Sequence, residues 1–172
     1  MVARLFPYCH NIIKAIGLQD KIYKDTEPLQ HIIDNIYLGD YRAADNPTLL
    51  SQYNITHIIN CAFNLPCKYP QYKYLALNLK DEVKQEILDK MEESYQFIKQ
   101  NSKSNILVHC VFGKSRSGSV VIYYLMKDKG MKYQEAYDYV YKIRNVLSPK
   151  SIPTLLPVVI FSLSFVFKLT QI

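Results

Sequence analysis

A short apolar strand that ends at a cysteine constrains this chain more than any other feature. Residues 106–108 are fully apolar, and Cys110 follows them after one histidine. A turn rich in glycine and serine comes next, and a helical pattern begins near Arg116. In open α/β sheets, ligands bind where the carboxyl ends of the strands meet the following helices. The segment therefore predicts a ligand-binding loop between a buried strand and a helix.

The rest of the chain alternates between strand-like and helix-like patterns. Further strands are predicted at 31–38 (a short pair ended by Gly39), 55–61 and 74–79. Apolar residues recur at helical spacing in the segments 43–53, 85–103, 116–129 and 133–144. This alternation predicts a single α/β domain, with a central, mostly parallel, twisted sheet of about five strands flanked by helices.

Three details of the helical segments follow from their residues. Pro47 is expected to lie early in the segment 43–53 or to break it. Gly130 is expected to cap the helix that precedes it. Tyr133, Tyr137 and Tyr141 form a stripe on the last helix, which we interpret as packing and not as a ligand platform.

The two ends of the chain are assigned by pattern alone. Residues 1–27 are interpreted as a helical extension and residues 28–172 as the catalytic domain. The apolar run 155–169 is interrupted by proline and lysine and falls short of the ~20 residues of a membrane span. We therefore expect a buried final helix and no stable membrane insertion, with a membrane-surface contact as the alternative.

Charge and cysteine content limit the classes of partner. The net charge of +6 favours anionic partners, but the lysines are scattered, so no nucleic-acid partner is expected. Cys9, Cys61, Cys67 and Cys110 fit neither a metal site nor a disulfide scaffold. We therefore expect no metal, and a reducing compartment, cytoplasmic or nuclear.

The turn after Cys110 has the composition of an anion site. Gly113 and the small serines let backbone N–H groups converge beside a helix N-terminus, where phosphate binds readily. The same donors stabilise a thiolate and commonly lower a cysteine pKa from ~8.5 to between ~3.5 and ~7.5. Cys110 is thus a candidate nucleophile, and Arg116 offers a planar fork that matches two phosphate oxygens.

The nine residues HCVFGKSRS, at 109–117, resemble the loop of the protein tyrosine phosphatase superfamily, in which five residues separate cysteine from arginine. The GxSRS ending and the short chain most resemble the small, vaccinia-related dual-specificity class. Segments 36–39, 55–61 and 77–81 are similar to two strands and the acid-bearing segment of that class. The resemblance covers roughly residues 30–150.

The resemblance implies a metal-independent protein phosphatase that needs no cofactor and forms a phosphocysteine. It implies a phosphate-binding loop made of Val111, Phe112, Gly113, Lys114, Ser115 and Arg116. Cys110 would be the nucleophile and Arg116 the phosphate clamp. The Ser117 hydroxyl would hydrogen-bond the thiolate and assist its departure, with local capping as the alternative.

Asp81 and His109 are two further candidate functional residues. By resemblance Asp81 is the acid, although Glu82 is adjacent and either residue could instead cap the next helix. His109 is expected to point away from the pocket and to act on the thiolate only indirectly.

The resemblance also sets the expected substrates. A short chain implies a shallow pocket that accepts phosphotyrosine, phosphoserine and phosphothreonine on proteins. Lys114 leaves open the alternative that the chain is a phosphoinositide phosphatase, although Val111 stands where such enzymes usually have a second basic residue. A non-catalytic phosphate-binding scaffold on the same fold and an RNA triphosphatase of the same superfamily also stay open. The sequence does not decide whether residues 1–27 mediate a homodimer, as the N-terminal helix does in some viral relatives.

Overall fold

The computed structural model describes residues 26–81 and 87–149. The strands of this part are β1 (Leu29–Ile33), β2 (Ile36–Gly39), β3 (Ile55–Ala62), β4 (Lys73–Leu79) and β5 (Asn105–His109). They form one sheet in the order β1-β2-β5-β3-β4, in which only the β1–β2 pair is antiparallel. The predicted fold, a mostly parallel sheet of about five strands, is therefore confirmed.

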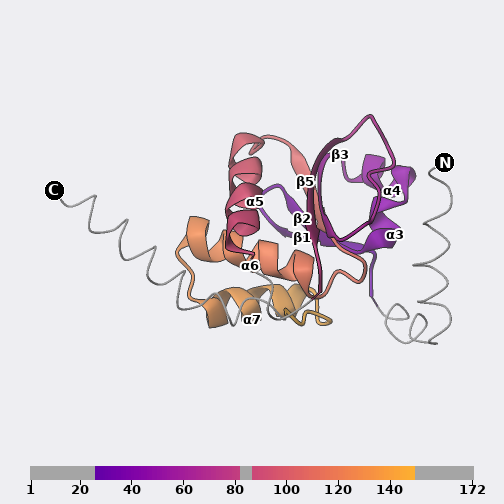
Figure 1. Cartoon of the computed structure of the whole chain (residues 1–172). Coiled ribbons are helices and arrows are strands. Elements are labelled where there is room, and N and C mark those ends of the chain that lie inside the picture. Colours follow the sequence, from indigo (N-terminus) through magenta and orange to yellow (C-terminus); the bar gives the residue numbers. More distant parts are fainter. Residues whose placement is uncertain (1–25, 82–86, 150–172) are drawn as a thin grey trace.

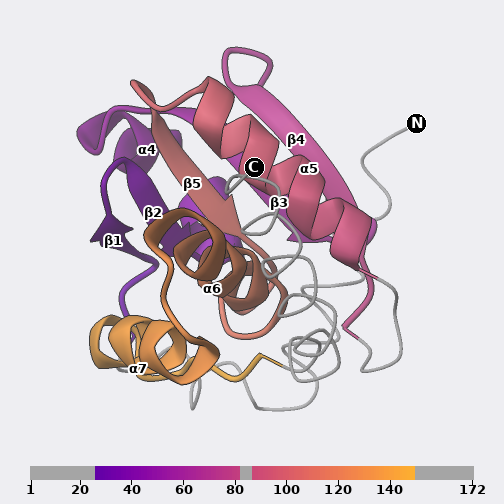
Figure 2. The ribbon, with the colours of Figure 1, turned by 90° about the vertical axis from the view of Figure 1, so that its left-hand side faces the viewer.

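Helices cover both faces of the sheet. Those of the described part are α3 (Tyr41–Ala44), α4 (Pro47–Gln52), α5 (Leu88–Gln100), α6 (Arg116–Lys129) and α7 (Tyr133–Ile143). In Figure 1, α3 and α4 lie on one side of the sheet and α5, α6 and α7 on the other. Figure 2 looks onto the second face, with α6 in front of β5 and α7 beside α6.

The segment predicted as one helix from 43 to 53 is two short helices. Asp40 caps α3, and the side chain of Asn46 caps α4 by accepting a 3.0 Å hydrogen bond from the Leu49 amide. Pro47 is the first residue of α4, where its missing N–H costs nothing. Because the proline ring cannot continue a preceding helix, it starts a new one here.

Strand β5 lies at the centre of the sheet and is buried on both faces. Ile106 and Val108 pack into a core beneath α5, α6 and α7, whereas Leu107 packs into a smaller core beneath α3 and α4. This two-sided burial explains why residues 106–108 are all apolar, as strands covered on both faces are. It also holds the following cysteine at a fixed place on the carboxyl edge.

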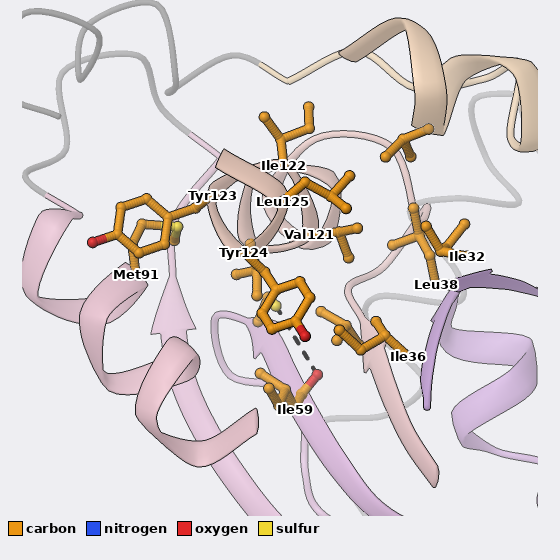
Figure 3. Close-up of a cluster of buried hydrophobic side chains, with 14 of the residues drawn as sticks. Ile32, Ile36, Leu38, Ile59, Met91, Val121, Ile122, Tyr123, Tyr124 and Leu125 are labelled. Carbon is orange, nitrogen blue, oxygen red and sulfur yellow. Dashed lines mark hydrogen bonds between the residues drawn. The ribbon is translucent and has the colours of Figure 1, made fainter. Parts of the chain in front are cut away.

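Helix α6 fills the larger core. Every residue from Arg116 to Met126 is buried. Figure 3 shows Tyr123 beside Met91 of α5, and Tyr124 turned toward Ile36 and Ile59 of the sheet. The helix ends as predicted at Gly130, which adopts the left-handed conformation with φ of +67°.

A β-bulge changes the direction of the last residues of β4. Asn60 of β3 pairs with Ala76, but Ala62 pairs with Leu79, so β4 carries one extra residue in this interval. Asn78 takes up the distortion with a positive φ of +52°. Bulges of this kind often lie next to functional sites, where they change the direction of a strand end. This one sets the course of the chain into Asp81.

Several sequence expectations fall outside the described residues. They concern Cys9, Glu82, most of the N-terminal extension 1–27 and the apolar run 155–169. Within the described ranges, no helix combines the length and the hydropathy needed to span a bilayer.

Candidate active site

Cys110 lies at the end of β5 with its thiol surrounded by donors. Its side chain is 1% exposed. The Gly113 amide and the Ser117 hydroxyl each donate a 3.2 Å hydrogen bond to Sγ. Ser117 lies in the first turn of α6 and its hydroxyl contacts the sulfur, in keeping with the first of the two roles considered for it.

The surroundings of Cys110 favour its thiolate. Burial alone would raise its pKa, but the Arg116 charge, the Ser117 hydroxyl and the backbone amides of Ser117 and Lys114 outweigh burial. The pKa of Cys110 is therefore lowered from its ordinary value. A thiolate is the nucleophilic form of cysteine, so the site is suited to nucleophilic chemistry.

The loop is held from outside by its carbonyl groups. The acceptors and their donors are Val111 O with Tyr41 N (3.2 Å), Phe112 O with Arg144 Nη2 (3.5 Å), Gly113 O with Arg144 Nε (2.7 Å), Lys114 O with Ser148 N (3.0 Å) and Ser115 O with Ser119 N (2.8 Å). In a planar trans peptide the next N–H points opposite to the carbonyl. The amides of residues 112–116 therefore face the inside of the loop, where they form an anion-binding nest.

Arg144 is the main support of the loop, and no sequence pattern marked it. Its side chain is fully buried. Its guanidinium donates to the carbonyl oxygens of Gly113 (2.7 Å), Phe112 (3.5 Å) and Glu27 (3.0 Å), and to the side chains of Gln30 (2.8 Å) and Asp40 (3.5 Å). Asp40, also fully buried, supplies the opposite charge and pairs with Arg42 at 2.8 Å. Arg144 is a positioning residue.

Glycine is required at position 113. Its φ is +62°, in the left-handed region that side chains disfavour. A Cβ atom there would lie 2.5 Å from Arg144 Nη2 and 2.6 Å from the Gly39 carbonyl oxygen. The loop, the end of β2 and Arg144 thus pack too closely for any other residue.

Arg116 is oriented by the end of β4. Its side chain is buried, and Nη1 donates a 3.3 Å hydrogen bond to the Leu79 carbonyl oxygen. Its Nε has no hydrogen-bond partner among the described residues. An arginine fixed in this way at the mouth of an amide nest can receive two oxygens of a phosphate group.

Asp81 follows β4 on the carboxyl edge of the sheet and is exposed. It lies two residues after Leu79, whose carbonyl group holds Arg116. The structure thus brings the acid segment and the cysteine loop to the same edge. The catalytic roles of Asp81, Cys110, Arg116 and Ser117 stay predictions.

His109 is buried behind the cysteine. It borders a cavity of about 20 Å³, together with Tyr41 and Asp45 on the α3 side of the sheet. Burial lowers its pKa from 6.5 to about 4, against the effect of a backbone hydrogen bond with Cys110. Its ring is therefore neutral at neutral pH, and its position agrees with the expectation that it points away from the pocket.

The described part of the chain holds no group of three or more histidine, cysteine, aspartate or glutamate side chains arranged to bind a metal ion. The residues gathered at the loop are donors for an anion: amides, a hydroxyl and a guanidinium. Chemically, the site can bind a phosphate ester and attack it with sulfur.

Comparison with known proteins gives a consistent family. Residues 36–155 match the family model "Dual specificity phosphatase, catalytic domain". A probable rhodanese domain-containing dual specificity protein phosphatase of Dictyostelium discoideum is 38% identical over 125 residues, which are 71% of this chain and 26% of that protein. Dual specificity protein phosphatase 1 of Arabidopsis thaliana is 35% identical over 136 residues, 76% of this chain and 68% of that protein.

Solved structures share the fold. The crystal structure of human DUSP28 superposes with a TM-score of 0.75 and covers 81% of this chain and 97% of its own. Its identity of 24% supports the fold alone.

Proposed function

The chain belongs to the dual-specificity phosphatase family, and we propose from this premise that it hydrolyses phosphate esters of protein side chains through a phosphocysteine intermediate. One observation carries the proposal. Two donors converge on Cys110 Sγ at 3.2 Å, in a loop whose amides face inward beside Arg116. Such a nest favours both a thiolate and a bound phosphate.

In the first step the Cys110 thiolate attacks phosphorus in line with the ester oxygen. The amides of residues 112–116 and Arg116 receive the phosphoryl oxygens and stabilise their charge. As the S–P bond forms and the P–O bond breaks, Asp81 transfers a proton to the leaving oxygen. A general acid of this kind contributes typically ~10²–10⁴-fold to the rate.

In the second step water attacks the phosphocysteine. The Asp81 carboxylate takes a proton from the water, and the S–P bond breaks. Inorganic phosphate leaves and Cys110 returns to its thiolate. The hydrogen bond from the Ser117 hydroxyl, 3.2 Å from Sγ, stabilises the sulfur as it accepts negative charge.

The proposed substrates are proteins that carry phosphotyrosine, phosphoserine or phosphothreonine; the support is that the relatives are named dual specificity protein phosphatases. Because a catalytic thiolate must stay reduced, we further propose a reducing compartment, cytoplasmic or nuclear. The proposal includes a homodimer contact through residues 1–27, supported by their amphipathic pattern and tested by sedimentation of the full chain over a concentration series.

The decisive experiment is hydrolysis of p-nitrophenyl phosphate and phosphopeptides with EDTA present. We expect turnover by the wild type and none by Cys110→Ser. Rapid acid quench of the wild type during turnover should trap a phosphocysteine. A folded wild type that is inactive on both substrates would contradict the proposal. Phosphate release from a soluble phosphoinositide, but not from phosphopeptides, would favour a lipid phosphatase instead.

A further inference from the structure

Phe63 is an exposed aromatic side chain that has no role in the core. Within the described ranges it and Tyr141 are the large hydrophobic side chains that stay exposed, at 45% and 43%. Tyr141 stacks on Tyr137 of α7, with ring centroids 5.7 Å apart. Phe63 instead follows β3 on the carboxyl edge of the sheet, the edge that carries the cysteine loop.

The turn that presents Phe63 is held in place by a buried side chain. Asn60, 1% exposed, accepts a 3.0 Å hydrogen bond from the Ala62 amide and donates a 2.7 Å hydrogen bond to the Leu65 carbonyl oxygen. Asn64 completes the turn with a φ of +55°. Phe63 therefore stands on an ordered turn, which lowers the entropy cost of binding through its ring.

The same turn is joined to the phosphate clamp. The Phe63 amide donates a 3.1 Å hydrogen bond to the Leu79 carbonyl oxygen, and Arg116 Nη1 donates to that oxygen at 3.3 Å. One acceptor at the end of β4 thus fixes both groups. The turn and the phosphate clamp therefore lie side by side on the carboxyl edge of the sheet.

Positive charge adjoins the ring. Lys80 is exposed, and its Nζ lies 5.8 Å from the centroid of the Phe63 ring. Neither Lys80 nor Lys114 of the loop forms an ion pair within residues 26–81 and 87–149. The rim therefore offers an apolar surface next to the positive charge of Lys80.

We infer that Phe63 and Lys80 form a subsite for the peptide residues that flank the phosphorylated side chain. An apolar side chain of the substrate packs on the Phe63 ring, and an acidic side chain pairs with Lys80. A lipid headgroup would use the lysines but would leave the ring without a partner, so a phosphopeptide fits both groups better. This inference rests on the proposed function and names the sequence context that the site selects.

The test measures kcat/KM on a phosphotyrosine peptide with a leucine and a glutamate beside the phosphotyrosine, and on p-nitrophenyl phosphate. For Phe63→Ala we expect the ratio of the two values to fall about tenfold, in line with partial burial of one aromatic ring, and mainly through KM. Lys80→Ala should lower the ratio several-fold, and only for the peptide with glutamate. An unchanged ratio in Phe63→Ala would overturn the inference.

Two control variants match the test variants. Tyr141→Ala removes, on α7, the second of the two large hydrophobic side chains that are exposed in the described ranges. Lys73→Ala removes a lysine at the opposite end of β4 whose Nζ also lies over an aromatic ring, 5.9 Å from the centroid of Phe97. Both should leave the peptide ratio as in the wild type. A fall as large as that of Phe63→Ala in either control would make the effect nonspecific and contradict the subsite.

Binding separates the subsite from the chemistry. Fluorescence anisotropy of the labelled phosphopeptide is measured with Cys110→Ser alone and combined with Phe63→Ala. We expect about tenfold weaker binding in the double variant. If the wild type hydrolyses neither substrate, the proposed function fails, but this comparison still decides the subsite. Equal Kd values would contradict the inference even in an active enzyme.

Discussion

The fully buried guanidinium of Arg144 donates a 2.7 Å hydrogen bond from Nε to the carbonyl oxygen of Gly113. Residues 31 positions apart are thereby joined, one in the cysteine loop and one just after α7. The bond turns the Gly113 carbonyl group outward, which turns the following amide inward. The orientation of the anion nest thus depends on a residue that touches neither sulfur nor substrate.

Arg144→Lys is expected to weaken the nest while keeping the charge opposite Asp40. A lysine cannot span the two loop carbonyls with one planar fork. Fewer amides will then face the sulfur, so the pKa of Cys110 will rise. The midpoint of iodoacetamide alkylation against pH should move upward by about one pH unit, with kcat about 10- to 100-fold lower at pH 6.

Arg144→Met is the comparison for Arg144→Lys, because it removes the positive charge as well as the hydrogen bonds. Asp40 would keep only Arg42, and the buried carbonyl oxygens of Gly113 and Glu27 would lose their donor, which together should cost about 3–5 kcal/mol of unfolding free energy in urea. If Arg144→Lys had a wild-type alkylation profile despite a lower stability, Arg144 would be only a structural residue and not a positioning one.

Gly113→Ala is expected to lower both stability and activity, because the added Cβ meets Arg144 Nη2 at 2.5 Å and the backbone of Gly39. Gly130→Ala is the matched control, with a φ of +67° and no atom within 4 Å of the added Cβ. The control should lose about 1 kcal/mol of unfolding free energy from conformational strain alone. Its kcat should match the wild type, whereas Gly113→Ala should lose most of its turnover; equal losses in the two variants would contradict the close packing of the loop.

The fold and the chemical groups were predictable because they depend on local pattern. The unbroken apolar run 106–108 predicts a strand that is buried on both faces. The glycine and serine content around Gly113 predicts the anion-binding loop. Arg144 has no such signal. Its sequence neighbours are ordinary, and its role arises only when the end of α7 is brought back against β2 and the loop. Phe63 is similar, because its exposure depends on a turn held by Asn60 and on a bulge in β4.

His109 is expected to make stability depend on pH. Burial lowers its pKa from 6.5 to about 4, so between these values the unfolded chain binds a proton that the folded chain does not. The contribution is complete above pH 6.5 and is lost as pH falls toward 4. From pH 7.5 to 5.0 the unfolding free energy should fall by about 2 kcal/mol for this reason.

Urea titrations of the wild type, His109→Gln and His57→Gln at the two pH values measure this effect. Burial lowers the pKa of His57 too, but the side chain is only half-buried, so its variant should keep most of the pH dependence. The His109→Gln variant should lose most of this pH dependence of the unfolding free energy. An equally steep fall in His109→Gln would show that another group is responsible.

Asp81→Asn is expected to affect substrates according to their leaving group. A general acid matters most when the departing oxygen is strongly basic, as in phosphoserine, and least for p-nitrophenol, which leaves readily as an anion. We expect kcat on a phosphoserine peptide to fall by about 10²-fold or more, and kcat on p-nitrophenyl phosphate to fall much less.

Asp89→Asn and Glu82→Gln separate the competing interpretations of this aspartate. Asp89 lies in the first turn of α5 and tests the effect of losing an acidic residue at a helix start. If Asp81 only stabilised that helix, both aspartate variants would lower the melting temperature and neither would discriminate between substrates. If Glu82→Gln alone showed the leaving-group dependence, the acid would be the adjacent glutamate. A dependence of kcat confined to Asp81→Asn assigns the proton to Asp81, because a residue that only binds the peptide, such as Phe63, acts mainly through KM.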